Sequence, residues 1–512
     1  RPAPDAAPYA RPAGVPTAQD LLTAEKPLAF FDAHLDHADG YVEKVKRAMD
    51  AVRPITPCFE IRANWHDIER LPGAYDFSAI DALLDHAAQN GSRVQPLISF
   101  HAPEWAPSHY TQNPQGEIFG HNVYLFHGAR LNLYQSPVLR PAALKFVEAL
   151  VRHCRRHPAL MSYYFLIEHP GEAPYKGWHE GFDPFTLANF RAAMRAKHGD
   201  VAKANAAWKT HFPDFAAVMP PLPGAEAANA FWLDWMRFRD DGVESFRDAY
   251  VDAVRRLDPE RMVMSYGDGT PNMAGKGVFT ANGGCARPEV AALAMATVAD
   301  RGTPQRAEEI TVTQWTDYPW RLDDSLFTMM HGGGVNAHCK MFFPVDVFER
   351  AKSLDALRRP PHGLDRFEKF LPLWAELHPE RLENGGEVRY FFDADADLLT
   401  RKTTFFGGHD PWNAMLFLDA QVPFGVAPGR DWEKAKLVVV HDSLNRALGD
   451  QTREALARYV ENGGNLLFFA AAGRYSIERG ASDGGLLLGH AAQDLEKEKR
   501  LNAPENDWLL LR

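Results

Sequence analysis

At 512 residues the chain is longer than one hydrophobic core usually supports, so we expect at least two domains. Its formal net charge of −11 argues against nucleic acid as a partner, and no run of about 18 apolar residues predicts a membrane span. The four cysteines (Cys58, Cys154, Cys285 and Cys339) are too widely spaced to indicate a zinc cluster or a disulfide framework, so we expect no metal and no cofactor.

Residues 1–27 are expected to form an extended lead-in, because the segment Arg1–Gly14 is rich in proline and alanine. A start without methionine is typical of an exported protein after cleavage of its signal peptide, or of a fragment. It favours a periplasmic or secreted location over the cytoplasm. From Arg479 onward the sequence is charged and irregular, and a continuation of the natural chain past Arg512 is left open.

Between about Leu28 and Leu357, short apolar runs alternate with longer amphipathic stretches. The expected strands are Ile55–Ile61, Arg93–Ser99, Ser162–Ile167, Met262–Ser265, Ile310–Gln314 and Asn336–Phe343. The helices expected between them include Pro141–Cys154, Pro184–His198 and Trp232–Leu257. This βα alternation predicts a parallel sheet, and residues 28–380 suit a closed (β/α)₈ TIM barrel with insertions. An open doubly wound sheet is the structural alternative.

A second unit is expected over residues 386–512. Glu387–Phe392 and Lys436–His441 have the character of strands, Thr452–Glu461 is helical, and Asn465–Ala470 follows a Gly-Gly turn as another strand. This pattern predicts a smaller, flavodoxin-like doubly wound α/β domain. It lacks a GxGxxG motif after a strand, so a packing or assembly role is favoured over nucleotide binding.

Several segments, taken in order, resemble glycoside hydrolase family 42, the β-galactosidases. RLPGAYDFSAID (Arg70–Asp81) is similar to that family's EP-x-x-G-x-YDFSWLD stretch, and PLISFHAPEWAPSHYTQNPQGEIFG (Pro96–Gly120) to its run after the third strand. KHGDVAKANAAWKTHFPDF (Lys197–Phe215) resembles the segment that follows the family's acid/base strand, and KLVVVHDSL with YVENGGNLLFFAAAG resembles its trimerisation domain. The resemblance implies a homotrimer and, although members often carry a cysteine zinc cluster, no such cluster is visible here.

The resemblance also implies hydrolysis of a β-glycoside with retention by two glutamates, at the ends of the fourth and seventh strands. One carboxyl protonates the leaving oxygen and the other attacks the anomeric carbon. Matching from His157–Pro158 places Glu168 on the family's acid/base, with Ile167 where the family has an asparagine that binds the sugar 2-hydroxyl. Glu172 is the rival, because HPGEAPY resembles the acid-bearing loop of β-amylase-like barrels.

The nucleophile position holds Gln314, at the end of the run ITVTQ. An amide has the shape of a carboxylate without its charge, so it can neither form the glycosyl ester efficiently nor stabilise positive charge at the anomeric carbon. Three interpretations stay open: a deliberate Glu→Gln substitution, catalysis by Asp317, Glu309 or another carboxylate, or a natural sugar-binding pseudoenzyme.

The other candidate substrate-binding residues follow predicted strands. Arg62 and Asn64 end the second strand and are candidates to bind hydroxyl groups, with a structural ion pair as the alternative for Arg62. His101 and Trp105 are candidates to border the sugar, with capping of the barrel as the alternative for Trp105. Trp315 and Tyr318 are candidates to stack on a sugar face, and Phe342 and Phe343 to form an aromatic platform, with core packing as the alternative for the two phenylalanines. Asp317 completes this set.

Three functions are therefore carried forward. The leading one is an exo-acting, retaining β-glycosidase acting on an oligosaccharide or glycoside. The others are a non-catalytic sugar-binding protein and an inverting, β-amylase-like hydrolase built around Glu172.

Overall fold

The computed structural model describes the barrel strands, most helices of the first two-thirds of the chain, and parts of a C-terminal sheet. The described residues are 28–33, 40–101, 103–117, 132–166, 181–222, 230–266, 279–283, 306–309, 338–341, 352–359, 364–365, 368–369, 372, 376, 387–393, 420, 422, 424–428, 431–440, 447–469, 475–477, 480–481, 501–503 and 506–511. No helix in these segments is long and apolar enough to cross a bilayer.

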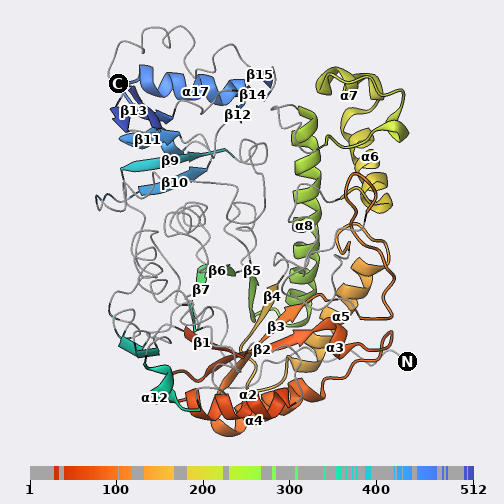
Figure 1. Cartoon of the computed structure of the whole chain (residues 1–512), viewed down its shortest axis with the longest axis vertical. Coiled ribbons are helices and arrows are strands. Elements are labelled where there is room, and N and C mark those ends of the chain that lie inside the picture. Colours follow the sequence, from red (N-terminus) through yellow and green to blue (C-terminus); the bar gives the residue numbers. More distant parts are fainter. Residues whose placement is uncertain are drawn as a thin grey trace.

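Eight parallel strands form a closed barrel in the order β1 to β8 (Figure 1). The barrel closes where β1 pairs with β8, with Leu28 opposite His338. The strands are β1 Leu28–Ala33, β2 Cys58–Asn64, β3 Arg93–Ser99, β4 Ser162–Leu166, β5 Met262–Tyr266, β6 Phe279–Gly283, β7 Arg306–Glu309 and β8 His338–Met341. The expected TIM barrel is therefore confirmed, and the alternative of an open sheet was wrong.

Helices outside the barrel bury their apolar faces against the strands. In α5, for example, Ala143, Val147, Leu150 and Cys154 follow the helical repeat and are buried. The described helices of the barrel region are α2 Tyr41–Val52, α3 Trp65–Ile68, α4 Ser78–Asn90, α5 Leu139–Cys154, α6 Pro184–His198, α7 Val201–Trp208, the 3₁₀ turn η1 Phe215–Ala217, α8 Ala230–Leu257 and α12 Leu354–Leu357.

Alternation along the strands decides which side chains face the barrel interior. In β2, Phe59, Ile61 and Ala63 belong to the apolar core shared with the helices. Their neighbours Glu60 and Asn64 are buried outside that core, on the opposite face of the strand. The even-numbered residues of β2 therefore point into the barrel, and the last of them lie at its C-terminal end, where barrel enzymes hold their active sites.

The predicted elements agree closely with the observed ones. β3 and α6 have the predicted bounds, and β4, β5, α5 and α8 differ from them by a few residues at most. The observed β2, Cys58–Asn64, lies three residues later than predicted, and β1 and β6 were not predicted. The described β7, Arg306–Glu309, pairs with β6, and the predicted run Ile310–Gln314 lies outside the described residues.

Helices α6, α7 and α8 form a separate apolar cluster beside the barrel. At 28 residues, α8 is about 42 Å long and reaches from the barrel toward β12 and β14 (Figure 1). Ala447 of β12 belongs to this cluster and Ile477 packs against it. The helical extension therefore contacts both the barrel and the C-terminal region.

Within this cluster, the carboxylate of Asp234 accepts hydrogen bonds from Lys197, His198 and Trp208. The distances are 2.9 Å from His198 Nε2 and 2.9 Å from Trp208 Nε1. Burial by itself would raise the pKa of Asp234, but the three donors outweigh it and hold that pKa below the usual value.

The C-terminal sheet has six strands in the order β10-β9-β11-β13-β17-β16. The first four are parallel, and β17 and β16 are antiparallel additions. Their bounds, with those of the nearby elements, are β9 Val388–Phe392, β10 Phe424–Pro428, η4 Asp431–Lys434, β11 Leu437–Val440, β12 Ala447–Leu448, α17 Asp450–Glu461, β13 Asn465–Phe469, β14 Tyr475–Ser476, β15 Gly480–Ala481, β16 Leu501–Ala503 and β17 Asn506–Leu511.

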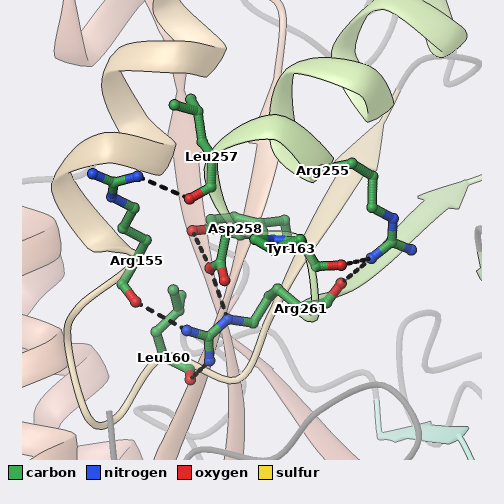
Figure 2. A network of polar contacts seen from close by, with 8 residues as sticks. Arg155, Leu160, Tyr163, Arg255, Leu257, Asp258 and Arg261 are labelled. Carbon is green, nitrogen blue, oxygen red and sulfur yellow. Dashed lines mark hydrogen bonds and ion pairs between the residues drawn. The ribbon is translucent and has the colours of Figure 1, made fainter. Parts of the chain in front are cut away.

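A buried polar network joins the N-terminal ends of β4 and β5 to the ends of α5 and α8 (Figure 2). The Arg261 guanidinium donates to Asp258 Oδ2 at 2.9 Å, to the Leu160 carbonyl at 2.8 Å and to the Arg155 carbonyl at 3.0 Å. Tyr163 Oη donates to the same Asp258 oxygen at 3.2 Å. Because this end of a barrel serves stability, we interpret the network as structural.

Candidate active site

The described part of the candidate site lies after β2 and β3, at the C-terminal end of the barrel. Arg62 is half-buried, and its backbone N–H donates to Tyr41 Oη at 2.9 Å. Asn64 ends β2, opposite Ser99 in the register between β2 and β3. His101 follows β3 and is buried. Three of the predicted substrate-binding residues are thus brought to one edge of the barrel.

Asn64 is held by hydrogen bonds at both ends of its amide. Ser99 Oγ donates to Asn64 Oδ1 at 2.7 Å, and Asn64 Nδ2 donates to Asp67 Oδ2 at 3.0 Å. Because Ser99 is fully buried and Asn64 nearly so, this bond links the ends of two adjacent strands. The structure thereby gives Asn64 an internal role that the sequence did not indicate.

Asp67 continues the same chain of contacts to a pair of histidines. Its Oδ1 lies 3.1 Å from His66 Nε2. The His66 ring in turn stacks on the His101 ring, with centroids 5.7 Å apart and planes inclined by 29°. Sequence reasoning missed His66 and Asp67, although a polar His-Asp pair directly after the strand-ending Asn64 and Trp65 was a signal that could have found them.

Trp105 is anchored from the β3 side to the turn after β2. Its Nε1 donates to the Glu69 carbonyl at 2.7 Å, and its ring meets Trp65 edge-on, with centroids 6.0 Å apart. The Glu69 carboxylate accepts from Trp65 Nε1 at 2.6 Å and from the Gly73 N–H at 2.7 Å. Trp105 therefore packs against the barrel core while remaining partly exposed.

A buried hydrogen bond between Asn132 and Asp183, which we call the clasp, joins the segments that follow β3 and β4. Asp183 caps α6 by accepting from the N–H groups of Phe185 and Thr186, and it also accepts from Asn132 Nδ2 at 2.8 Å. Asn132 is fully buried, and its N–H donates to the His109 carbonyl at 2.7 Å. The clasp therefore connects the segments that frame the C-terminal side of β3 and β4.

The remaining predicted site residues lie outside the described residues. These are Glu168, Glu172, Gln314, Trp315, Asp317, Tyr318, Phe342 and Phe343. Glu309 ends β7, but its side chain is not among the described ones. Their roles remain predictions from the sequence.

In the part of the chain that the structure describes, no three His, Cys, Asp or Glu side chains lie close enough to bind a metal ion together. Cys58 and Cys154 are free and buried, in β2 and at the end of α5. Burial raises the pKa of the Cys58 thiol to about 12 and also raises that of Cys154, so both remain protonated near neutral pH.

Comparison with known proteins connects this geometry to a family. Residues 59–275, which run from β2 to beyond β5, match the sequence model of the glycoside hydrolase family 42, described as beta-galactosidase. Over these residues the chain is similar to glycoside hydrolase family 42. The matched segment contains Arg62, Asn64, His66, His101 and Trp105, so the described candidate site lies in the part of the chain that carries the family pattern. No curated protein sequence matches the chain.

Solved structures of the same fold include β-galactosidases. The enzyme from Rahnella sp. R3 is 15% identical, with a TM-score of 0.67 over 91% of this chain and 74% of the other. The enzyme from Bacillus circulans sp. alkalophilus is 16% identical, with the same TM-score and coverages. The catalytic domain of β-amylase from Paenibacillus polymyxa is 13% identical, with a TM-score of 0.51 over 69% of this chain and 99% of that domain. At these identities the likenesses establish the fold of this chain.

Proposed function

We propose that this chain is built to hydrolyse terminal β-linked glycosides with retention of configuration, with galactosides as the first substrates to test. The observation that carries the proposal is the closed barrel with hydrogen-bonded polar side chains at the C-terminal ends of β2 and β3, inside the segment that matches the family. Barrel enzymes place their catalytic groups at this end.

We assign the acid/base role to Glu168, with Glu172 as the rival. Ser162 and Tyr164 are buried outside the core shared with the helices, and Ser162 Oγ donates to Gln95 Oε1 at 2.9 Å across the interior. Glu168 has the same even position in the alternation of β4, which supports an orientation toward the barrel axis. A carboxyl at this position is expected to protonate the leaving oxygen.

The nucleophile is assigned to position 314, which carries glutamine in this chain. Arg62 and His101 are assigned to polar contacts with the sugar, together with Asp317. Trp315, Tyr318 and Phe343 are assigned to its apolar faces. Asn64 and Trp105, whose polar groups bond within the protein, are assigned to shaping the site.

Gln314 is the specific observation that favours a second candidate, a sugar-binding protein without turnover. The two functions are separated by the variant Gln314→Glu assayed on nitrophenyl β-glycosides. A retaining glycosidase is expected to gain several orders of magnitude in kcat/KM, because the variant restores the charge and the attacking oxygen. A variant that binds sugar but hydrolyses no member of the panel would instead support the binding protein.

The acid/base is identified in the Gln314→Glu background by Glu168→Ala and Glu172→Ala. Loss of the true acid is expected to abolish hydrolysis of glycosides with poor leaving groups and to spare 2,4-dinitrophenyl glycosides, which depart without a proton. Added azide should then yield a β-glycosyl azide from that variant alone. First release of the α-anomer, followed by NMR, would favour the inverting, β-amylase-like alternative built on Glu172 and would contradict the retaining assignment.

We further propose that residues 386–512 form a flavodoxin-like domain that supports a trimer, behind a barrel domain of residues 28–380. Numbered within the sheet, the parallel strands β9, β10, β11 and β13 have the order 2-1-3-4, which is the flavodoxin-like order, and α17 joins β11 to β13. Light scattering coupled to size exclusion tests the trimer. A single monomeric species at micromolar concentration would contradict it.

A further inference from the structure

The hydrogen-bonded chain after β2 ends on a residue that the proposed function assigns to the substrate. Its links run from Ser99 Oγ to Asn64 Oδ1 at 2.7 Å, and from Asn64 Nδ2 to Asp67 Oδ2 at 3.0 Å. They continue from Asp67 Oδ1 to His66 Nε2 at 3.1 Å, and then by ring stacking from His66 to His101. The first and last links join the ends of β2 and β3, and the two links between them lie within the segment Asn64–Asp67.

The chain is buried at both ends, with His101 8% exposed, and is most exposed between them. Ser99 is fully buried, and the Asn64 amide is 6% exposed. The side chain of His66 is 17% exposed and that of Asp67 is 32% exposed. An unsupported imidazole rotates about two side-chain bonds, whereas one stacked on a second, hydrogen-bonded ring keeps its plane. The arrangement therefore fixes a ring at the edge of the site, starting from the sheet.

Side chains alternate between the two faces of β3, and this alternation places His101 on the face toward the barrel interior. Val94, Ile98 and Phe100 belong to the core shared with the helices, and the Phe100 ring packs on Phe246 of α8. His101 follows Phe100 and is not part of that core, and it stacks on His66 instead. Its imidazole nitrogens are hydrogen-bonding groups of the kind that recognise sugar hydroxyls.

We propose that His66 and Asp67 are positioning residues that hold the His101 ring in the orientation in which it binds a hydroxyl group of the terminal sugar. This inference rests on the proposed function, since it takes the barrel mouth to be a glycoside site. It adds two residues to the specificity of that site, neither of which contacts the sugar itself.

The test uses the full chain and calorimetric binding of alkyl 1-thio-β-glycosides, which resist hydrolysis. The probes are the isopropyl thio-derivatives of galactose, glucose and mannose, and the tightest of them is then used for the variants. His101→Ala is expected to weaken binding about tenfold or more, the equivalent of a lost hydrogen bond to a hydroxyl. His66→Ala is expected to weaken it about three- to tenfold, and His66→Phe, which keeps a ring for stacking, by less.

Non-additivity distinguishes positioning from independent contacts. Because Asp67 acts through His66, the double variant His66→Ala/Asp67→Ala is expected to bind no more weakly than His66→Ala alone. The matched control is His86→Ala, since His86 Nε2 lies 2.8 Å from Asp50 Oδ1 with a similar side-chain exposure of 21%, but on helices outside the barrel. It is expected to leave the affinity unchanged.

A kinetic readout in the Gln314→Glu background separates positioning from a general structural defect. His66→Ala is expected to raise KM about three- to tenfold with kcat changed less than threefold, because a contact made equally in the ground and transition states affects KM. If the substitution only destabilised the protein, part of it would be unfolded and inactive, so the apparent kcat would fall while KM stayed unchanged. That result would overturn the assignment.

The two levels of the proposal fail differently. If the unmodified chain binds none of the thioglycosides, the glycoside site itself is wrong and the inference falls with it. If the chain binds one of them and both His66→Ala and Asp67→Ala bind it equally well, the positioning role alone is wrong.

Discussion

Arg261 offers the sharpest test of how the barrel is held together. Its side chain is fully buried and donates three hydrogen bonds, to the Asp258 carboxylate and to the carbonyls of Leu160 and Arg155 (Figure 2). The substitution Arg261→Met keeps most of the stem volume and removes every donor. It leaves Asp258 as a buried carboxylate that still accepts a hydrogen bond from Tyr163.

The expected cost is about 4 kcal/mol in the free energy of unfolding. Removing one partner of a buried ion pair costs about 3–5 kcal/mol. The two carbonyls that lose their donor add up to about 1 kcal/mol each, and the apolar packing of the methionine stem offsets a similar amount. Since domains are stable by about 5–15 kcal/mol, a single substitution would remove a large part of the total.

The measurement is equilibrium urea unfolding followed by tryptophan fluorescence and far-UV circular dichroism together, so that separate unfolding of the C-terminal region is visible. The double variant Arg261→Met/Asp258→Asn is expected to cost about 2 kcal/mol less than Arg261→Met. The neutral amide no longer buries a charge and still accepts from Tyr163. Burial, reinforced by the Asp258 charge, raises the pKa of Tyr163 well above its usual value, so its hydroxyl stays protonated and can donate near neutral pH.

The matched control is Arg256→Met, in the last turn of α8 and five residues before Arg261. Arg256 pairs with Glu148 at 2.6 Å, but its side chain is 57% exposed, so solvent screening limits the expected cost to less than about 1 kcal/mol. The reasoning would be refuted if Arg261→Met cost no more than Arg256→Met, or if adding Asp258→Asn recovered nothing.

Three further predictions concern other buried polar groups. Asp183→Ala is expected to lower the free energy of unfolding by about 2–3 kcal/mol, because it removes both the cap of α6 and the partner of the buried Asn132. The loss, measured by thermal or urea unfolding, should clearly exceed that of Asp200→Ala at the exposed start of α7. Equal losses would contradict the structural role of the Asp183–Asn132 hydrogen bond. Asp234→Asn is expected to cost about 2 kcal/mol at neutral pH. The pKa of Asp234 is lower in the folded protein than in the unfolded one, so its carboxylate contributes to stability at pH values above the unfolded pKa. This contribution disappears as the pH falls through the folded pKa. A destabilisation by Asp234→Asn that grows in acid would therefore contradict the donor arrangement. Cys58 and Cys154 are expected to react with iodoacetamide at pH 8 at least about 100-fold more slowly in the native protein than in denaturant, as read by peptide mapping; comparable labelling would show that they are accessible.

Most of the barrel scaffold could be predicted from the sequence because strand and helix periodicities are local. The runs at Arg93–Ser99 and Pro184–His198 are bounded by residues that terminate the elements, such as the capping Asp183, and the predicted bounds are the observed ones. β1 and β6 were missed, and the described β7 precedes its predicted run. Their place in the barrel depends on pairing with neighbours such as β8 and β5, which is a non-local interaction.

The sequence also located Arg62, Asn64 and His101 at strand ends, since the ends of predicted strands can be read from periodicity and composition. It could not reveal that Ser99, Asn64, Asp67 and His66 form one chain of contacts ending on His101. Ser99 and Asn64 are 35 residues apart, and only the register between β2 and β3 brings them opposite each other.

By itself, then, the sequence determined the order of strands and helices, the family resemblance, and the residue types available at the barrel mouth. These depend on neighbours along the chain and on recurring motifs. The tertiary structure alone decided that the strands close into a barrel, that Arg261 satisfies three partners from separate elements, and that two histidines stack beside Asp67. Such contacts join residues distant in sequence, and their geometry is set by the packing of the whole fold.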